Sequence, residues 1–269
     1  MRAGRGHANG LGGEQVEGHH AVQALLTEGR RRAHRLWVAD ADTAGEPLAR
    51  IARLAAQRGV PVQSRPAAAI AATARTGAPQ GVIAWADPVL PVELEELLAG
   101  FSVGEPYVLL VLDGVTDPGN FGSLLRTGSC AGVRGVVVAR HRSAALTPAA
   151  VKAAAGAVEH VPIALVGGVP AALQRLSRAG IWVAGLDPDG DEELWHSRLL
   201  DGPVALVLGS EGKGISRLVR QRCDALVRIP QLGSMGSLNV AAATAVACFE
   251  VARRFDVARH RDGAEPGLA

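Results

Sequence analysis

The strongest pattern along the chain is a series of short apolar runs in its second half. The runs cover residues 107–112, 135–139, 161–166, 181–186, 204–208 and 225–229. Between them, helical spacing of apolar residues appears at 122–131, 148–155, 170–179, 215–222 and 238–254. Because the runs are continuous rather than alternating, they predict strands of a parallel sheet with both faces buried. Residues 106–256 are therefore predicted to form a doubly wound α/β domain.

The first part of the chain has weaker and shorter elements. Helices are predicted at 20–28, 47–58 and 66–74, and strands at 35–39, 60–63 and 80–86. This alternation predicts a small α/β domain over residues 14–88, with a largely parallel sheet. Prolines and glycines surround one short acidic helix at 92–98, so residues 89–105 are predicted to be a linker. Residues 1–13 and 257–269 are predicted to be disordered tails.

Composition adds an aliphatic character and a local positive charge. Apolar residues make up 48% of the chain and aromatic residues only 3%, so the cores are expected to be aliphatic. The net charge of +2 excludes little by itself. The basic residues cluster, however, at Arg30, Arg31, Arg32 and Arg35. Such a patch is typical of phosphate contact, with a solvated helix end as the alternative.

The cysteines and the hydropathy pattern limit the class of protein and its cellular compartment. Three widely spaced cysteines give neither a disulfide framework nor the spacing of a zinc site. The first residues lack the apolar core of a secretory signal, and no apolar run approaches the ~18 residues of a membrane span. We therefore expect a reduced, cytoplasmic protein that binds neither a metal nor a membrane.

Three polar loops follow predicted strands, where open α/β sheets bind their ligands. The first contains the turn Asp117-Pro118-Gly119, with Asn120 at a helix start and Arg126 six residues later. From spacing alone, Asn120 is equally readable as a helix cap and Arg126 as a surface charge.

The second loop runs from Gly209 to Gly214, with the sequence Gly-Ser-Glu-Gly-Lys-Gly. It is not a Walker loop, because Val207 stands where that motif requires glycine. The dinucleotide fingerprint Gly-x-Gly-x-x-Gly is also missing, which argues against a nicotinamide-dependent oxidoreductase. Glu211 in this loop has the alternative reading of a charge at a helix N-terminus.

The third loop lies between the apolar run that ends at Ile229 and the last helix. Ser237 and Asn239 are both residue types that cap helices, and either is placed to cap this one. The helix that follows is rich in alanine, and small residues permit close packing. The sequence thus predicts a core helix that also supplies part of a dimer contact, at the positions Ala241, Ala242, Ala243, Ala245 and Ala247.

Together the loops resemble the motifs of the SpoU (TrmH-like) branch of the SPOUT RNA methyltransferases. The matching stretches are Asp117-Pro118-Gly119-Asn120 with Arg126, Leu208 to Gly214, Ile229-Pro230, and Ser237-Leu238-Asn239-Val240. The chain departs from the family pattern at Gln231, where the family usually has Met, and at Ala241-Ala242, where it usually has Ser-Val. Residues 14–88 resemble, more weakly, the L30e-like substrate-binding domain of the large-subunit rRNA guanosine 2′-O-methyltransferases, through residues 17–22 and 80–82.

This resemblance implies a fold, a cofactor and an activity. It implies a trefoil-knotted parallel-sheet domain, an obligate homodimer, S-adenosyl-L-methionine as methyl donor and the 2′-hydroxyl of an RNA ribose as acceptor. Large-subunit rRNA is the expected substrate; a tRNA-directed enzyme and a non-catalytic RNA-binding relative are the alternatives. By the same resemblance, the cofactor is held by backbone around Gly209, Ile229 and Leu238.

The resemblance also implies a catalytic neighbourhood, made of Asn120, Arg126, Glu211, Ser237 and Asn239. A guanidinium is essentially always protonated, so we favour Arg126 as a clamp on an RNA phosphate over Arg126 as a base, and both roles stay open. Asn120 and Ser237 are expected to orient the ribose. Glu211 is expected to fix either Arg126 or its own loop.

Overall fold

The computed structural model describes residues 10–40, 45–102, 105–141, 143–234 and 236–261. The chain divides into two compact units. Unit 1 comprises residues 1–91, 117–126 and 144–160, and unit 2 comprises residues 92–116, 127–143 and 161–269. Of the two predicted tails, residues 1–9 and 262–269 lie outside the described residues.

Unit 1 is built on a four-stranded sheet with the order β1-β4-β2-β3. Only β2 and β3 run parallel, and β4 is antiparallel to both of its neighbours. The predicted largely parallel sheet is therefore wrong. The helices α1 and α2 do connect strands of the same direction, but β4 enters the space between β1 and β2 from the opposite end. The strands are Gln15–Glu17 (β1), Ala33–Ala39 (β2), Val62–Arg65 (β3) and Val82–Ala86 (β4).

One face of this sheet carries the core of unit 1. Val16, Leu36 and Ala84 share a register row on that face, and none of the three is exposed to solvent. Buried residues of α1 and α2, such as Leu25 and Ile51, complete the core. The helices of unit 1 are His19–Glu28 (α1), Glu46–Gln57 (α2), Ala67–Thr73 (α3), Pro148–Ala154 (α6) and the short Ala157–Glu159 (η2), with the first part of α5.

The chain before β1 is ordered where it is described. The Leu11 amide donates to the Val89 carbonyl at 2.8 Å, and the Val89 amide donates to the Gly12 carbonyl at 2.9 Å. Residues 10–13 are thus paired with a later segment, although the sequence predicts that they belong to a disordered tail. Backbone hydrogen bonds do not depend on side-chain type. A short stretch that is held by them to a distant segment therefore shows no hydrophobic pattern.

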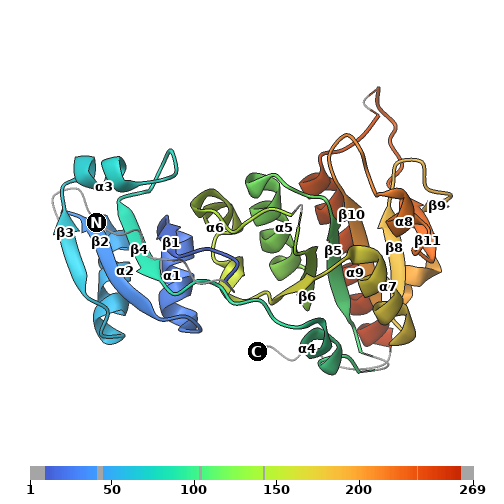
Figure 1. The fold of residues 1–269 in the computed structure, drawn as a ribbon, viewed down its shortest axis with the longest axis horizontal. Helices are drawn as coiled ribbons and strands as arrows, with labels where there is room; N and C mark the ends of the chain where they lie inside the picture. The colour runs from blue at the N-terminus through green and yellow to red at the C-terminus, as the bar shows by residue number, and fades with distance from the viewer. Residues whose placement is uncertain (1–9, 41–44, 103–104, 142, 235, 262–269) are drawn as a thin grey trace. The chain divides into compact units, whose positions relative to one another are not determined.

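Unit 2 is built on seven strands in the order β7-β6-β5-β10-β8-β11-β9, and every pair is parallel. Figure 1 shows β10 between β5 and β8. The predicted parallel sheet of the second domain is confirmed. Its strands are Val108–Asp113 (β5), Gly135–Ala139 (β6), Ile163–Val166 (β7), Trp182–Leu186 (β8), Glu192–Glu193 (β9), Val204–Gly209 (β10) and Ala225–Arg228 (β11).

Helices cover the sheet of unit 2 and bury its aliphatic strands. Leu109, Val111 and Val207 belong to one buried cluster with residues of α4, α7 and α8. The predicted linker therefore contains a helix, α4, whose Leu94 and Leu97 are part of this core. The helices are Leu94–Ala99 (α4), Pro118–Cys130 (α5, which spans both units), Val169–Arg178 (α7), Arg198–Asp201 (η3), Arg217–Arg220 (α8) and Val240–Arg261 (α9).

Three helices differ most from the prediction. The helix expected at 122–131 begins four residues earlier, at Pro118. The helix expected at 215–222 is the single turn α8, because Ser216 still has an extended backbone. The last helix, α9, begins two residues later than expected and continues to Arg261, into the predicted tail. Within the described residues, no helix combines the length and the apolar character that crossing a membrane requires.

Candidate functional site

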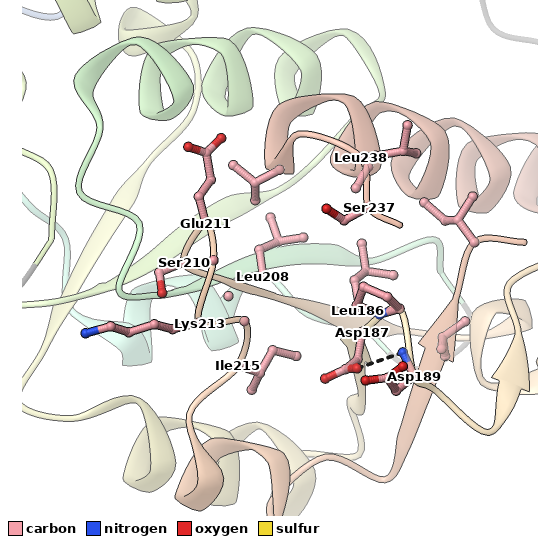
Figure 2. Close-up of a pocket in the computed structure, with 18 of the residues that line it drawn as sticks. Leu186, Asp187, Asp189, Leu208, Ser210, Glu211, Lys213, Ile215, Ser237 and Leu238 are labelled. Atoms are coloured by element: carbon pink, nitrogen blue, oxygen red, sulfur yellow. Dashed lines mark hydrogen bonds between the residues drawn. The ribbon is translucent and has the colours of Figure 1, made fainter. Parts of the chain in front are cut away.

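A pocket of about 360 Å³ opens at the carboxyl ends of three neighbouring strands of unit 2, β10, β8 and β11. Three loops line it, and they follow these strands at residues 187–189, 209–215 and 229–238. The lining residues drawn in Figure 2 come from all three loops. This edge is where a parallel sheet brings successive loops together, which is why open α/β sheets bind ligands there.

The loop after β10 is a tight hairpin closed by its own backbone. The Gly214 amide donates to the Ser210 carbonyl at 2.8 Å, and the Ser210 amide donates to the Gly214 carbonyl at 3.1 Å. Gly212 and Gly214 have φ values of 77° and 63°, which side-chain-bearing residues rarely adopt. A Cβ on Gly209 would lie 2.1 Å from the carbonyl carbon of Gly214. These glycines are therefore required by the hairpin itself.

The side chains at the tip of this hairpin point in different directions. Lys213 extends away from the other labelled residues, whereas Glu211 rises from the hairpin on the other side (Figure 2). Glu211 does not lie in the first turn of α8, which begins at Arg217. Glu211 is thus not a charge at the N-terminus of α8.

Asn239 joins this hairpin to the start of α9. Its Oδ1 accepts from the Ala241 amide at 2.8 Å, so Asn239 caps the helix. Its Nδ2 donates to Oε1 of Glu211 at 2.6 Å. Ser237 is exposed and lines the pocket, as Figure 2 shows together with Leu238. Of the two residues predicted as caps, Asn239 has that role, and one amide side chain fixes two of the three loops.

The loop after β8 contributes an aspartate that sequence reasoning missed. Asp187 is buried; its Oδ1 accepts from the Asp189 amide at 2.9 Å, and its Oδ2 accepts from Nη1 of Arg220 at 2.6 Å. It therefore ties its own loop to α8 on the pocket wall. The signal was present in the sequence, because Asp187-Pro188-Asp189 directly follows the apolar run 181–186.

One cysteine lies close to these strands and stays protonated. Burial, together with the nearby carboxylates of Asp224 and Asp113, raises the pKa of the Cys223 thiol to about 12. The Sγ atom donates to the Val219 carbonyl at 3.4 Å. A thiolate is the nucleophilic form of cysteine, so Cys223 is a packing residue at neutral pH.

Asn120 and Arg126 both lie on α5, in the stretch 117–126 that belongs to unit 1, whereas the pocket lies in unit 2. Asn120 is not the cap of α5. Instead, its backbone amide donates to Oδ1 of Asp117 at 2.7 Å, so Asp117 caps the first turn. Asn120 is half-buried and Arg126 is exposed. The reading of Asn120 as merely a cap is therefore wrong.

Comparison with known proteins identifies both parts of the chain. Residues 107–249 match the model described as the SpoU rRNA Methylase family, more than half of the chain. Residues 15–91 match the model for RNA 2'-O ribose methyltransferase substrate binding. The chain belongs to the SpoU rRNA methylase family. Among its relatives, the 23S rRNA (guanosine-2'-O-)-methyltransferase RlmB of Pseudomonas putida is 40% identical, over 91% of this chain and 98% of that one.

Solved structures of SpoU-type proteins have the same fold. The AdoMet-bound rRNA methyltransferase from Sinorhizobium meliloti is 26% identical with a TM-score of 0.70, over 89% of this chain and 86% of that one. A TrmH-family protein from Porphyromonas gingivalis is 31% identical with a TM-score of 0.67, over 89% of both chains. These matches extend over both units of this SpoU family member.

The residues predicted from the SpoU resemblance fall into two groups. The predicted cofactor residues Gly209, Ile229 and Leu238 all line the pocket. Glu211 and Ser237 line it with them, and Asn239 is bonded to Glu211. Asn120 and Arg126 form the second group on α5. The roles of all eight residues stay predictions.

Proposed function

We propose that this protein transfers a methyl group from S-adenosyl-L-methionine to the ribose 2′-hydroxyl of a guanosine in 23S rRNA. The observation that carries the proposal is the pocket formed by the SpoU motif loops at the carboxyl edge of the parallel sheet. Relatives named for this reaction match nearly the whole chain at about two identical residues in five. The match of residues 15–91 to a substrate-binding model supports an RNA substrate.

The pocket suits S-adenosyl-L-methionine in size and chemistry. Its volume of about 360 Å³ is within the usual range of small-molecule sites. Aliphatic side chains, such as Leu186, Leu208 and Leu238, offer a surface for the adenine ring. Asp189 and Ser237 add polar groups for its hydroxyl and amino groups. When bound, the cofactor supplies an electrophilic methyl group on a positively charged sulfur. The backbone near Gly209, Ile229 and Leu238 would hold it.

The chain's own side chains would position the ribose. A hydroxyl is a weak nucleophile that loses its proton as it attacks, so alignment of the reacting atoms supplies much of the rate. Asn120 and Ser237 would hydrogen-bond the ribose. Arg126 would hold an adjoining RNA phosphate through the hydrogen-bond donors of its exposed guanidinium group. Of the two predicted roles for Glu211, its bond to Asn239 supports fixing the loop.

We also propose a homodimer, in which α9 takes part. Ala242, Phe249 and Val257 are all exposed on this helix, and Trp195 is an exposed aromatic residue of the same unit. The predicted alanine surface needs correction, however. Ala247 is fully buried, so it does not face a partner, whereas Ala243 is half-buried and lines the pocket. Sedimentation of the purified chain tests the dimer. The trefoil knot and the cytoplasmic location stay predictions.

One experiment tests the activity and its substrate together. The protein is depleted from its source cell, ribose methylation is mapped across rRNA and tRNA, and the purified chain is added back to the unmethylated RNA. Loss and restoration at one 23S rRNA guanosine is the expected result. Loss restricted to tRNA would reverse the substrate. An unchanged map, with no transfer in vitro, would favour a non-catalytic RNA-binding relative.

A further inference from the structure

The second face of the sheet of unit 1 mixes apolar and polar residues and is only partly buried. Residues paired directly across neighbouring strands point to the same side of a sheet. The register therefore places three rows on this face: Gln15, Trp85 and Arg35; Glu17, Ile83, Trp37 and Gln63; and Ala39 with Arg65. This face bears two of the chain's four tryptophans.

The two tryptophans of these rows meet edge to face, and an arginine guanidinium lies over each ring. The rings of Trp37 and Trp85 are 5.1 Å apart between centroids, with an interplanar angle of 71°. The guanidinium of Arg35 lies 4.2 Å from the centroid of Trp85, and that of Arg65 lies 4.9 Å from the centroid of Trp37. Both indoles are half-buried and both arginines are exposed. We call Arg35, Trp37, Gln63, Arg65 and Trp85 the indole face.

Gln63 fixes the ring of Trp37 within the indole face. Its Oε1 accepts from Nε1 of Trp37 at 3.0 Å and from Nη2 of Arg65 at 2.9 Å. The indole N–H is therefore satisfied, and the ring is held in one orientation. A flat ring whose orientation is fixed loses little conformational freedom when a second flat group stacks on it.

The charge of this face is positive. Arg35 and Arg65 are its exposed cations. The one acid in the three rows, Glu17, has no solvent-exposed surface and accepts from the amides of Arg75 and Thr76 at 2.7 and 3.1 Å. The segment after α3 thus covers Glu17 and satisfies its carboxylate. Its negative charge does not face a ligand on the indole face.

We propose that the indole face binds an unpaired stretch of the substrate RNA. Nucleobases stack on indole rings and guanidinium planes, and the same guanidinium groups attract phosphates. Bases within a duplex have no free face for such stacking, so the ligand is single-stranded. Tryptophan and arginine also anchor protein partners, but residues 15–91 match a substrate-binding model of RNA methyltransferases, which favours RNA as the ligand. The proposal extends the proposed function, because it names how unit 1 would recognise the RNA.

The test measures binding of a labelled adenosine decanucleotide by fluorescence anisotropy on the full chain. The double variant Trp37→Leu with Trp85→Leu is expected to bind it at least about tenfold more weakly, because stacking carries that much affinity per base. Trp37→Phe with Trp85→Phe keeps the flat rings and is expected to stay within a few-fold of the unaltered chain. Trp182→Leu, an exposed tryptophan of unit 2, is the matched control. A blunt RNA duplex of the same length is expected to bind more weakly throughout.

Methylation kinetics separate this proposal from the proposed function. With rRNA transcript as substrate, the leucine pair is expected to raise KM and leave kcat and cofactor affinity unchanged. If the unaltered chain binds the decanucleotide but methylates no rRNA, the proposed function fails and the indole face stands. Unchanged oligonucleotide binding by the leucine pair would overturn the indole face. So would equal binding of duplex and single strand, or no binding by the unaltered chain.

Discussion

The sheets of the two units differ in which part is accessible to solvent: the edge in unit 2 and part of one face in unit 1. In unit 2, every residue of 108–112 and 204–208 is buried, and helices pack against the sheet. Its pocket therefore lies at an edge, among the loops that follow the strands. In unit 1, one face carries the core and the other keeps half-buried tryptophans and exposed arginines. Its open surface is the part of this second face that α3 and the following segment leave accessible.

This difference follows from strand direction. Parallel strands place all their carboxyl ends at one edge, so loops far apart in the sequence, such as 209–215 and 229–238, meet there. Convergent loops can surround a small molecule. In unit 1, α3 and the segment after it cover only part of the second face of the mixed sheet. The remaining part presents side chains at regular spacing, which suits an extended ligand. We therefore propose that the loops and motif residues within 107–249, the range that matches the SpoU methylase model, carry the chemistry. The indole face would recognise the RNA.

The largest effect is expected from Arg126→Ala, which tests the chemical half of this comparison. Loss of the proposed phosphate clamp should lower kcat by about 100-fold to 10,000-fold, typical of removing one positioned group that acts in the transition state. Methyl transfer from labelled cofactor to rRNA transcript measures it. Cofactor affinity, measured by calorimetry, should change little. Asn120→Ala should likewise lower kcat and leave cofactor affinity nearly unchanged. Arg178→Ala, on α7, is the control; an equal loss of cofactor affinity would contradict the division of roles.

The next effect concerns how each unit is stabilised. Arg31 and Glu159 form an ion pair in unit 1 with side chains 8% and 2% exposed, and Arg31 also donates to the carbonyls of Gly13 and Asp87. Removing one partner of a buried pair leaves an uncompensated charge and costs about 3–5 kcal/mol. Glu159→Ala should therefore destabilise unit 1 strongly, as measured by amide exchange in β2 and β4.

The control for that variant is Glu46→Ala. Glu46 pairs with Arg53, but these side chains are 76% and 61% exposed, so the pair contributes at most about 1 kcal/mol. Amide exchange in β5 and β10 should stay unchanged in both variants, since unit 2 relies on its aliphatic core. Equal losses from the two glutamates would show that burial of the pair does not matter for unit 1.

The sequence predicted the elements of unit 2 more accurately than those of unit 1, for a physical reason. Strands buried on both faces are continuous apolar runs, which are recognisable in any short segment of the sequence. In unit 1, β1 has only three residues and was missed, and β4 enters antiparallel, which no local pattern records. The stretch 10–13 was assigned to a tail because its bonding partners lie near Val89 and Leu146.

The site was predictable in part, because motif residues cluster at strand ends. The pocket lining includes Gly209, Ile229 and Leu238 as expected. The choice between Ser237 and Asn239 as the cap was not predictable, since both residue types accept from a free amide. The contribution of Asp187 was missed for another reason. Its position after an apolar run is visible in the sequence, but its bond to Arg220 joins segments that are distant in sequence.

A smaller effect is expected from Gly209→Ala, which tests whether the edge loops must pack this closely. The added Cβ would lie 2.1 Å and 2.3 Å from backbone atoms of Gly214 and Ile215, so the hairpin has to move. Overpacking of this kind costs about 2 kcal/mol, which corresponds to roughly 30-fold weaker cofactor binding by calorimetry. Gly233→Ala is the control, because nothing lies within 4 Å of its added Cβ. Unchanged affinity in Gly209→Ala would show that the hairpin does not shape the cofactor site.

The smallest effect separates the two bonds of Asn239. Asn239→Ser keeps an oxygen that can cap α9 but loses the donor to Glu211, whereas Asn239→Ala loses both. Loss of a cap costs about 1 kcal/mol. The free energy of unfolding, measured in urea, should therefore be lower by that amount in the alanine variant than in the serine variant. If the bond to Glu211 orders the edge of the sheet for catalysis, both variants should lose methyl transfer equally. Full activity in the serine variant would mean that Asn239 serves the helix alone, and the two loops would then be positioned by their backbones.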